Sequence, residues 1–140
     1  MNLSINVSTY AELSEMITDR VHMYFPHLTV ACLMPEDEEY VRVVDCYGMH
    51  VCNGGNDSKL LFNLYSLVEF AMYDDGLMRL YSVIAHELGH HQHMLDDIED
   101  FMTCSDYKAE LLAWRKGEAF IEEAFIDLYD DYNKTNLSYY

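Results

Sequence analysis

The sequence predicts an α+β fold in which one small β-sheet packs against several helices. The chain has 140 residues and is 51% hydrophobic, so it is long and apolar enough to form a single domain, residues 1–140, around one core. Short runs with strand character gather between residues 28 and 53, whereas apolar residues recur at helical spacing before and after them. Strands and helices segregated along the chain in this way are typical of the α+β class.

A first helix is predicted over about residues 8–25. Ser8 is the expected N-cap, and Glu12 would lie in the first turn. Pro26 ends the helix, because the residue before a proline disfavours helical dihedral angles. The apolar positions that give this segment its helical spacing are Leu13, Met16, Ile17, Val21 and Tyr24.

The small sheet is predicted over about residues 28–53. Residues 28–33 are apolar and partly β-branched, as in a buried strand. Residues 40–45 and 47–52 are expected to form two further strands, joined by a tight turn near residues 46–48.

Three helices are expected in the second half of the chain. The glycine-rich and asparagine-rich stretch 53–57 is the clearest break in the sequence. After it, residues 58–73 are apolar on nearly all sides, which predicts a buried helix. The next two helices are predicted over about residues 77–94 and 106–130. The first of these contains the motif described below, and the second is the C-terminal helix of the predicted fold.

The sequence His86-Glu87-Leu88-Gly89-His90 matches the pattern H-E-x-x-H within the helix predicted over 77–94. Positions four apart differ by about 40° around a helix, so both imidazoles leave one face and can bind one zinc ion. Glu87 lies about 100° from His86, beside the metal, where it can act as a general base toward a water that the metal has acidified. The motif predicts His86 and His90 as zinc ligands and Glu87 as the catalytic residue.

Two simpler interpretations compete with a catalytic zinc site. Two histidines can share a helix surface by chance, but Gly89 costs about 1 kcal/mol relative to alanine in a helix and indicates that something packs close to it. A purely structural zinc site would favour cysteine ligands. No C-x-x-C pair occurs among the four cysteines, which are Cys32, Cys46, Cys52 and Cys104.

Glu110 is the favoured third ligand. If residues 107–129 form one helix, Glu110 lies within an apolar stripe, and a buried carboxylate needs a partner such as Zn²⁺. The members of that stripe are Trp114, Gly117, Ile121, Ala124, Phe125 and Leu128.

Asp96 is the alternative third ligand. It occupies the position where the longer pattern H-E-x-x-H-x-x-G-x-x-H/D places its last ligand. That pattern requires a glycine at position 93, where this chain has His93, and a non-glycine residue adopts the required left-handed backbone only at a cost. Residues 96–100 also form a charged cluster that is typical of a solvated connection.

The motif, followed by a glutamate on a later helix, resembles the gluzincin group of zinc metallopeptidases. Within that group, the run from His86 to His91 and the stretch 107–114 resemble ImmA/IrrE-type and related small phage and bacterial metallopeptidase-like proteins. The resemblance covers about residues 75–128, and the chain lacks the glutamate that this type often has directly before Ala113. It implies zinc-dependent hydrolysis of a protein or peptide substrate, with His86, His90 and Glu110 as ligands and Glu87 as base.

Three further residues near the motif have less defined roles. His93 lies close to the face of His86 and could support the site or act as an extra ligand, although a partly exposed histidine is the simpler interpretation. His91 points about 100° away from His90, so it is not expected to bind the metal. Tyr107, one turn before Glu110, is the candidate for stabilising the oxyanion. The pair at 139–140 is expected to be a tail.

A net charge of -17 argues against direct binding to nucleic acid and favours a basic partner or peptide. It also supports an alternative to a peptidase, an acidic interaction protein or DNA mimic that inhibits a partner, with a structural metal. A further alternative is a metal-dependent hydrolase of a non-peptide substrate, because the motif fixes the activated water and leaves the substrate open. The acidic face proposed for the last helix consists of Glu118, Glu122, Glu123 and Asp127.

The expected location is a cytoplasm, and the resemblance extends this to a phage protein acting in its bacterial host. The first residues carry no basic start and no long apolar stretch, and no run approaches the roughly 18 apolar residues of a membrane span. Four scattered cysteines fit reduced thiols. The oligomeric state is not predicted.

Overall fold

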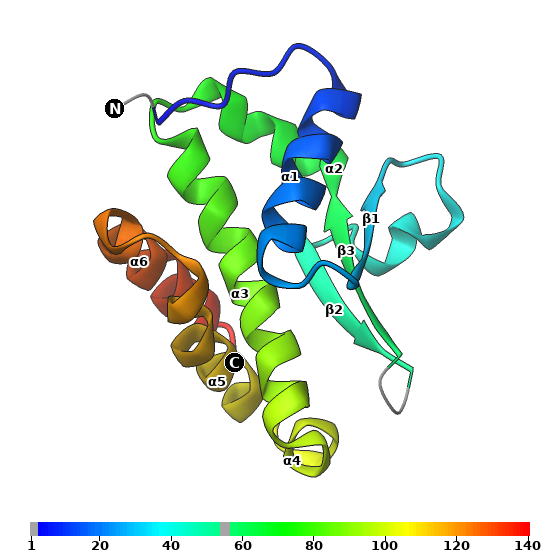
Figure 1. Ribbon diagram of the computed structural model, residues 1–140, viewed down its shortest axis with the longest axis vertical. Helices are drawn as coiled ribbons and strands as arrows, with labels where there is room; N and C mark the ends of the chain where they lie inside the picture. Colours follow the sequence, from blue (N-terminus) through cyan, green and yellow to red (C-terminus); the bar gives the residue numbers. More distant parts are fainter. Residues whose placement is uncertain (1–2, 54–56) are drawn as a thin grey trace.

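The computed structural model describes residues 3–53 and 57–140 and has an α+β fold that is mostly helical (Figure 1). The described residues contain one three-stranded mixed sheet with the order β1–β3–β2. Its strands are β1 (Thr29–Leu33), β2 (Gly48–Cys52) and β3 (Ser58–Asn63). The α-helices in these residues are α1 (Tyr10–Tyr24), α2 (Leu64–Leu67), α3 (Gly76–Asp96), α4 (Ile98–Thr103), α5 (Asp106–Gly117) and α6 (Ile126–Leu137).

Helix α1 confirms the first predicted helix, but its cap lies one residue later than expected. The hydroxyl oxygen of Thr9 accepts a hydrogen bond from the backbone N–H of Glu12 at 3.1 Å. Ser8 instead donates from its hydroxyl and its backbone N–H to the Glu12 carboxylate, at 2.9 and 3.1 Å. Ser8 and Thr9 together provide the hydrogen bonds that cap the first turn, so the helix begins close to the predicted position.

Strands β1 and β2 confirm two of the three predicted strands, whereas the strand predicted over residues 40–45 is wrong. Residues Glu38–Arg42 form a 3₁₀ helix there. Successive turns close this segment on itself, because the N–H of Tyr40 donates to the carbonyl of Asp37 and that of Val43 to the carbonyl of Tyr40. Its backbone groups are thus paired locally and are not available to a sheet.

The third strand, β3, lies where the sequence predicted the start of a helix over 58–73. It pairs parallel with β1 and antiparallel with β2. Leu60, Leu61 and Phe62 are all fully buried, because α1 and α3 cover one face of the sheet and a smaller cluster around Val43 covers the other. A central strand that is apolar on both faces has the same sequence pattern as a buried helix, which explains the error.

Helical structure begins only after β3. The side-chain oxygen of Asn63 caps α2 by accepting from the N–H of Ser66 at 3.1 Å, and a 3₁₀ helix, Val68–Met72, continues it. The predicted break at 53–57 separates β2 from β3; Gly54, Gly55 and Asn56 lie outside the described residues, and the N–H of Asn53 donates to the carbonyl of Asp57.

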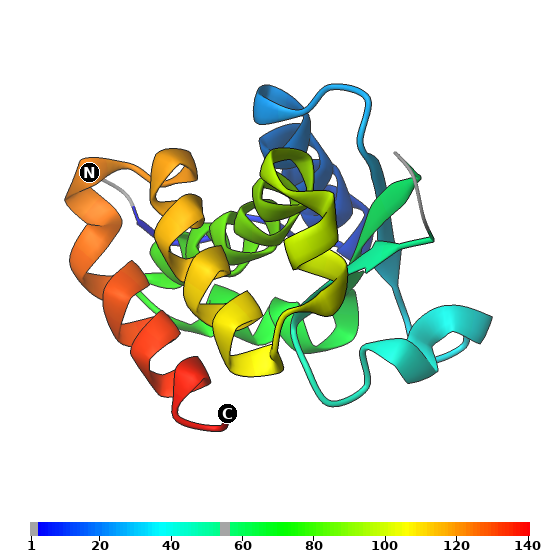
Figure 2. The same ribbon diagram turned by 90° about the horizontal axis from the view of Figure 1, so that it is seen from below.

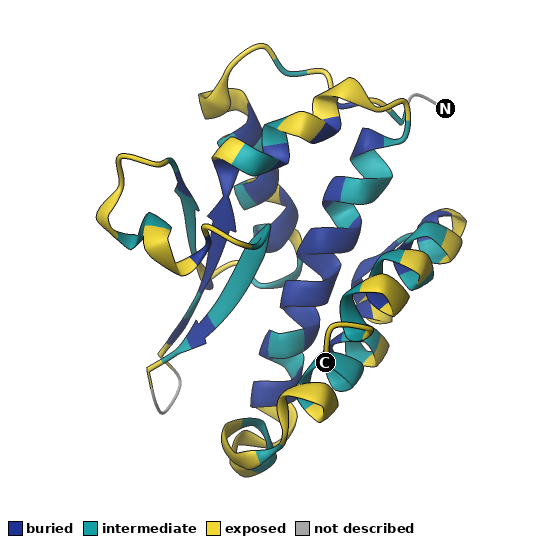
Figure 3. Ribbon diagram, turned by 180° about the vertical axis from the view of Figure 1, so that it is seen from behind, coloured by how far each residue is buried: buried dark blue, intermediate teal, exposed yellow. Residues whose placement is uncertain are grey.

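Helix α3 confirms the predicted helix over 77–94 and passes through the middle of the molecule (Figure 1). The sheet and α1 lie on one side of it, and α5 and α6 lie on the other (Figures 1 and 2). Most of α3 is buried, as Figure 3 shows. No helix in the described part of the chain is long and apolar enough to cross a membrane.

The single helix predicted over 106–130 is wrong, because the chain turns after Gly117. Two 3₁₀ segments, Glu118–Phe120 and Glu123–Phe125, lie between α5 and α6, and α6 runs back beside α5 (Figure 2). This return buries Phe120, Ile121, Phe125 and Tyr129, which a straight helix could not all direct into the core. The four acidic residues assigned to an outer helix face therefore do not share one helix, and Glu122 forms an ion pair with Arg20 at 2.5 Å.

Candidate metal centre

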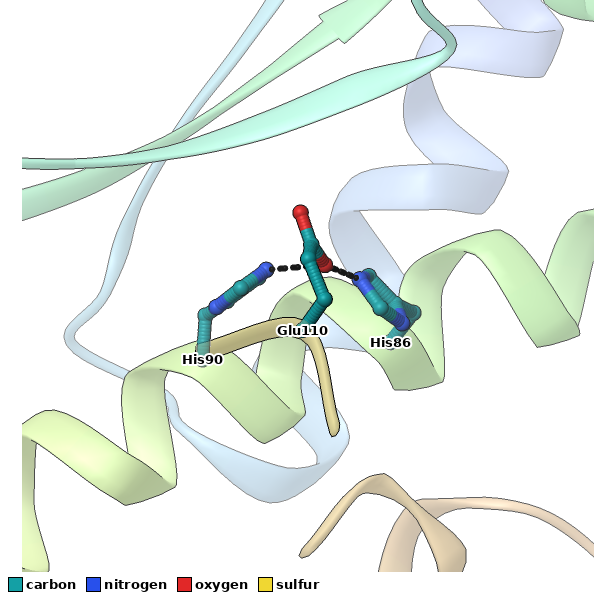
Figure 4. A group of neighbouring side chains, drawn as sticks. All are labelled: His86, His90 and Glu110. Atoms are coloured by element: carbon teal, nitrogen blue, oxygen red, sulfur yellow. Dashed lines mark hydrogen bonds and ion pairs between the residues drawn. The ribbon is translucent and has the colours of Figure 1, made fainter. Parts of the chain in front are cut away.

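His86 and His90 extend from one face of α3 toward the same carboxylate oxygen of Glu110 on α5. His86 Nε2 lies 2.6 Å and His90 Nε2 lies 3.1 Å from Glu110 Oε2 (Figure 4). The two imidazole centroids are 4.9 Å apart, as expected for residues separated by about one helical turn. The structure thus brings together the three residues that the sequence indicated as ligands.

Two glycines allow α5 to approach α3 closely enough for this contact. A Cβ atom at Gly89 would lie 2.0 Å from the carbonyl oxygen of Ala113, and one at Gly117 would lie 2.6 Å from the carbonyl oxygen of Ala85. The predicted close packing at Gly89 is therefore confirmed. Any side chain at these positions would force the two helices apart and withdraw Glu110 from the histidines.

The three donors fit a zinc ion in both spacing and chemistry. One ligand atom from each of His86, His90 and Glu110 lies within 4.8 Å of the other two. Zinc bonds of about 2.1 Å in a tetrahedral arrangement place ligand atoms about 3.4 Å apart, which small rotations of these side chains can reach. Two imidazoles and one carboxylate are a donor set used by catalytic zinc sites, which keep a fourth position for water or substrate.

Asn133 on α6 orients His86 from behind. Asn133 Oδ1 lies 2.6 Å from His86 Nδ1, and Asn133 Nδ2 donates to the backbone carbonyl of Tyr129 at 2.8 Å. Because the amide nitrogen already donates to Tyr129, the amide oxygen faces the imidazole, and Nδ1 carries the proton. His86 Nε2 is then the nitrogen that presents a lone pair to a metal. No sequence pattern indicated Asn133, because α6 reaches His86 only through the turn after Gly117.

Glu110 and His86 stabilise each other's charged forms at the centre. Burial alone would raise the pKa of Glu110, but hydrogen bonds from His86 and His90 lower it well below its usual range, so the carboxylate stays ionised. Burial opposes a charge on His86, yet Glu110 and Glu87 outweigh it and raise the pKa of that imidazole. An anionic carboxylate between two imidazoles is the environment that a divalent cation would enter.

Glu87 is buried beside the trio and lines the same cleft. The cleft has a volume of about 710 Å³ and is also lined by His86 and Glu110. Glu87 is held against the start of β2, where a Cβ atom on Gly48 would lie 3.2 Å from its Cγ. Burial raises the pKa of Glu87, with the charge of Glu110 adding to the effect, and the nearby imidazoles oppose it. The raised pKa makes the Glu87 carboxylate a stronger base than an exposed glutamate.

The alternative ligands lie elsewhere. The carboxylate of Asp96 is paired with Lys116 Nζ at 2.6 Å and with Gln92 at 2.8 Å, so the structure does not bring Asp96 to the centre. His93 is 1% exposed, which contradicts the expectation of a partly exposed histidine, and its Nε2 contacts Asp100. His91 points away from the centre, as expected, and its Nδ1 contacts His50.

Tyrosines from the end of the chain complete the cleft. Tyr107 is half exposed and is not among the residues that line the cleft, whereas Tyr132 on α6 lines it next to His86. Burial, with the charges of Glu87 and Glu110 adding to it, raises the pKa of Tyr132 well above its ordinary value, so its hydroxyl remains a donor. Tyr139 and Tyr140, which were expected to be a tail, are exposed and also line the cleft.

No protein family, curated protein or solved structure matches the chain in comparisons with known proteins. The interpretation of the centre therefore depends on its geometry and on the chemistry of its donors.

Proposed function

We propose that the chain is a zinc-dependent hydrolase that cleaves a peptide bond in a protein or peptide substrate. The observation that carries this proposal is one cleft lined by His86, Glu110 and the buried Glu87, with His90 completing a group of three zinc-type donors. Helix α3 would then be the active-site helix and α5 the helix that supplies the third ligand. A structural zinc site would not need a substrate-sized cleft or a free carboxyl beside the ligands.

His86, His90 and Glu110 would hold the ion. When bound, zinc lowers the pKa of a water molecule and polarises the scissile carbonyl. Asn133 keeps the His86 ring in the tautomer that leaves Nε2 free for the metal. The close packing of α5 on α3 fixes Glu110, so the ligands are arranged before substrate binds.

Glu87 would move the proton. It would accept a proton from the attacking water and return it to the amine that leaves when the C–N bond breaks. Its raised pKa supports the first step, because a carboxylate with a raised pKa is a stronger base toward the water. Tyr132 replaces Tyr107 as the candidate donor to the developing oxyanion, because its protonated hydroxyl belongs to a cleft residue.

The sheet favours a peptide over other hydrolysable substrates. In the order β1–β3–β2, strand β2 pairs on one side only among the described strands, and its first residue, Gly48, lines the cleft. An extended peptide can add to such an edge through backbone hydrogen bonds, which a small non-peptide substrate cannot do. The proposed place of action is a cytoplasm, where the four free cysteines stay reduced.

The test compares the wild-type chain with the Glu87→Gln variant and with Glu123→Gln, a matched change at an exposed glutamate. Each protein is loaded with zinc and added to a bacterial lysate, and new protein N-termini are identified by mass spectrometry. We expect wild type and Glu123→Gln to produce the same new N-termini, and Glu87→Gln to produce none while binding as much zinc as wild type. Equal cleavage by the Glu87→Gln variant would contradict the assigned mechanism.

A further inference from the structure

A second group of metal-type donors lies at the other end of the motif helix, where α3 turns into α4. It consists of His93 near the end of α3, Asp100 on α4 and Cys104 at the end of α4. One ligand atom of each residue lies within 4.8 Å of the other two. We propose that these three side chains bind a second divalent ion of the zinc type, which fastens α4 to α3.

The contacts within this group parallel those of the first centre. His93 Nε2 lies 2.8 Å from Asp100 Oδ2, just as the imidazoles of the first centre lie against Glu110. Asp100 and Cys104 are four residues apart, and the N–H of Cys104 donates to the carbonyl of Asp100 at 2.8 Å, so both side chains extend from the same side of one helical turn. The donor atoms of α3 and α4 thus lie close together where the two helices meet.

Protein contacts satisfy the hydrogen-bonding groups of the buried His93 side chain only in part. The side chain is 1% exposed, and its Nδ1 is buried with no hydrogen-bond partner among the described residues. Asp100 is its polar contact, while the Phe101 ring packs edge-on at a centroid distance of 5.4 Å. Burying an imidazole with one unpaired nitrogen is unfavourable. A cation at Nε2 would leave Nδ1 unpaired, but the coordination bond would offset part of the free-energy cost of burying the ring.

The donor set selects the class of metal. An imidazole, a carboxylate and a thiolate suit zinc or cobalt, whereas calcium and magnesium prefer oxygen ligands throughout. Lys108 Nζ contacts Asp100 Oδ1 at 2.6 Å and leaves Oδ2 for the ion, so this lysine fixes the carboxylate while adding a positive charge nearby. The carboxylate and a thiolate together would neutralise a divalent cation.

A metal at this position would stabilise the connection that carries Glu110. Helix α4 has six residues, which is too short to be stable without tertiary contacts. Cys104 is followed almost immediately by α5, on which Glu110 lies, and His93 follows His90 by less than one turn of α3. The second ion would therefore limit the movement of α5 relative to α3. This inference does not rest on the proposed peptidase activity.

The experiment measures metal content and spectra of the full chain after chelator treatment. Dialysis against zinc, followed by elemental analysis, should give two zinc ions per wild-type chain and one per chain for both Cys104→Ser and His86→Ala. Loading with Co²⁺ should produce a near-ultraviolet thiolate-to-cobalt charge-transfer band, because only the second site contains sulfur. That band should persist in His86→Ala and disappear in Cys104→Ser. The matched control is Cys46→Ser, which removes the cysteine that lines the cleft and should keep the band.

Several results would overturn the proposal: a wild-type chain that holds no more zinc than Cys104→Ser, no cobalt band, a band that survives Cys104→Ser, or a band lost in Cys46→Ser. Circular dichroism checks that each variant folds. If Cys104→Ser does not fold, Asp100→Asn takes its place, and we expect it to weaken zinc binding at the second site by at least about tenfold in competition with a chromophoric chelator. Unchanged affinity in that variant would equally overturn the site. None of these readouts requires cleavage, so this inference and the proposed function can fail independently.

Discussion

At the scale of single residues, the position of His86 depends on a side chain 47 positions away in sequence. The amide of Asn133 accepts from Nδ1 and is itself fixed by the carbonyl of Tyr129. Glu110 then lies between the two imidazoles, and Glu87 lies against Gly48 in the cleft. The centre is thus supported by neighbours on three elements other than α3.

Replacing Asn133 by alanine should weaken zinc binding at the His86 centre by about 10–100-fold, because the imidazole loses the acceptor that sets its tautomer and orientation. Competition with a chromophoric chelator measures the affinity. Asn133→Asp retains an acceptor for Nδ1 and should recover most of the lost affinity. Equal weakening by both variants would point to a general packing role for Asn133 instead.

Glu110→Gln and Asp96→Asn distinguish the two third-ligand hypotheses. Glu110→Gln should lose one zinc ion per chain in elemental analysis, because a neutral amide is a poor zinc ligand. Asp96→Asn should retain the wild-type zinc content, because its carboxylate is occupied by Lys116 and Gln92. The reverse result would favour Asp96 as ligand.

In the metal-free chain, the contact between Glu110 and His86 should make stability depend on pH. The pKa of Glu110 is lowered from 4.5, so its contribution is present above about that pH and is lost in acid. The pKa of His86 is raised from 6.5, so its contribution is present below about that pH and is lost as the imidazole deprotonates. The melting temperatures of the chelator-treated wild type and Glu110→Gln should therefore differ most between about pH 4.5 and 6.5. A difference that is constant across pH would contradict the assigned contact.

The sequence predicted part of the centre through spacing alone. The interval between His86 and His90 places both on one face of any helix, so it needs no knowledge of the tertiary structure. Glu110 was selected from an apolar stripe on one long helix, but the chain turns at Gly117, so only the part of that stripe on α5 exists. Asn133 and Tyr132 reach the centre only because of that turn, and no local pattern records it.

At the scale of elements, the packing of α5 on α3 decides whether the ligands meet. The contact is made through backbone atoms at Gly89 and Gly117, which leaves no space for a side chain. Helix periodicity predicted α1, which has both buried and exposed positions, whereas α3 is mostly buried and was recognised from its apolar run and its H-E-x-x-H motif. The same criterion failed for β3, which is buried on both faces, and for Glu38–Arg42, where local turns replace strand pairing.

Gly89→Ala should destabilise the fold by about 1–3 kcal/mol, because the cost of separating two packed helices exceeds the gain in helix propensity. It should also reduce zinc binding, since Glu110 moves away with α5. Urea unfolding and elemental analysis measure the two effects. Glu15→Ala, on the exposed side of α1, is the control for helix propensity and should leave both unchanged. A Gly89→Ala variant as stable as wild type would show that the helices can separate without penalty.

At the scale of the whole molecule, α3 lies between two layers, the sheet with α1 and the pair α5 and α6 (Figures 1 and 2). The composition and the order of segments were enough to predict the α+β class. The arrangement of the layers was not predictable, because it depends on contacts such as Arg20 with Glu122 and Trp114 with Asp130. Metal bound by α3 and α5 would join the central helix to the layer of α5 and α6.

Removing zinc with a chelator should lower the melting temperature on the order of 10 °C, because a ligand present at about 1,000 times its dissociation constant contributes about 4 kcal/mol. Hydrogen exchange should increase first in α5 and α6, whereas β3 should remain protected. Glu87→Gln should respond like wild type, since Glu87 is not a ligand. Insensitivity of wild type to the chelator would contradict a bound metal.

The position of Tyr139 and Tyr140 against the cleft has a practical consequence. Any polypeptide fused after Tyr140 would emerge beside Glu110, so a carboxy-terminal affinity tag would compete with whatever the cleft receives. A polyhistidine tag there would additionally supply foreign imidazoles to a loaded centre. Recombinant protein for the assays above should therefore carry a cleavable tag at its amino terminus.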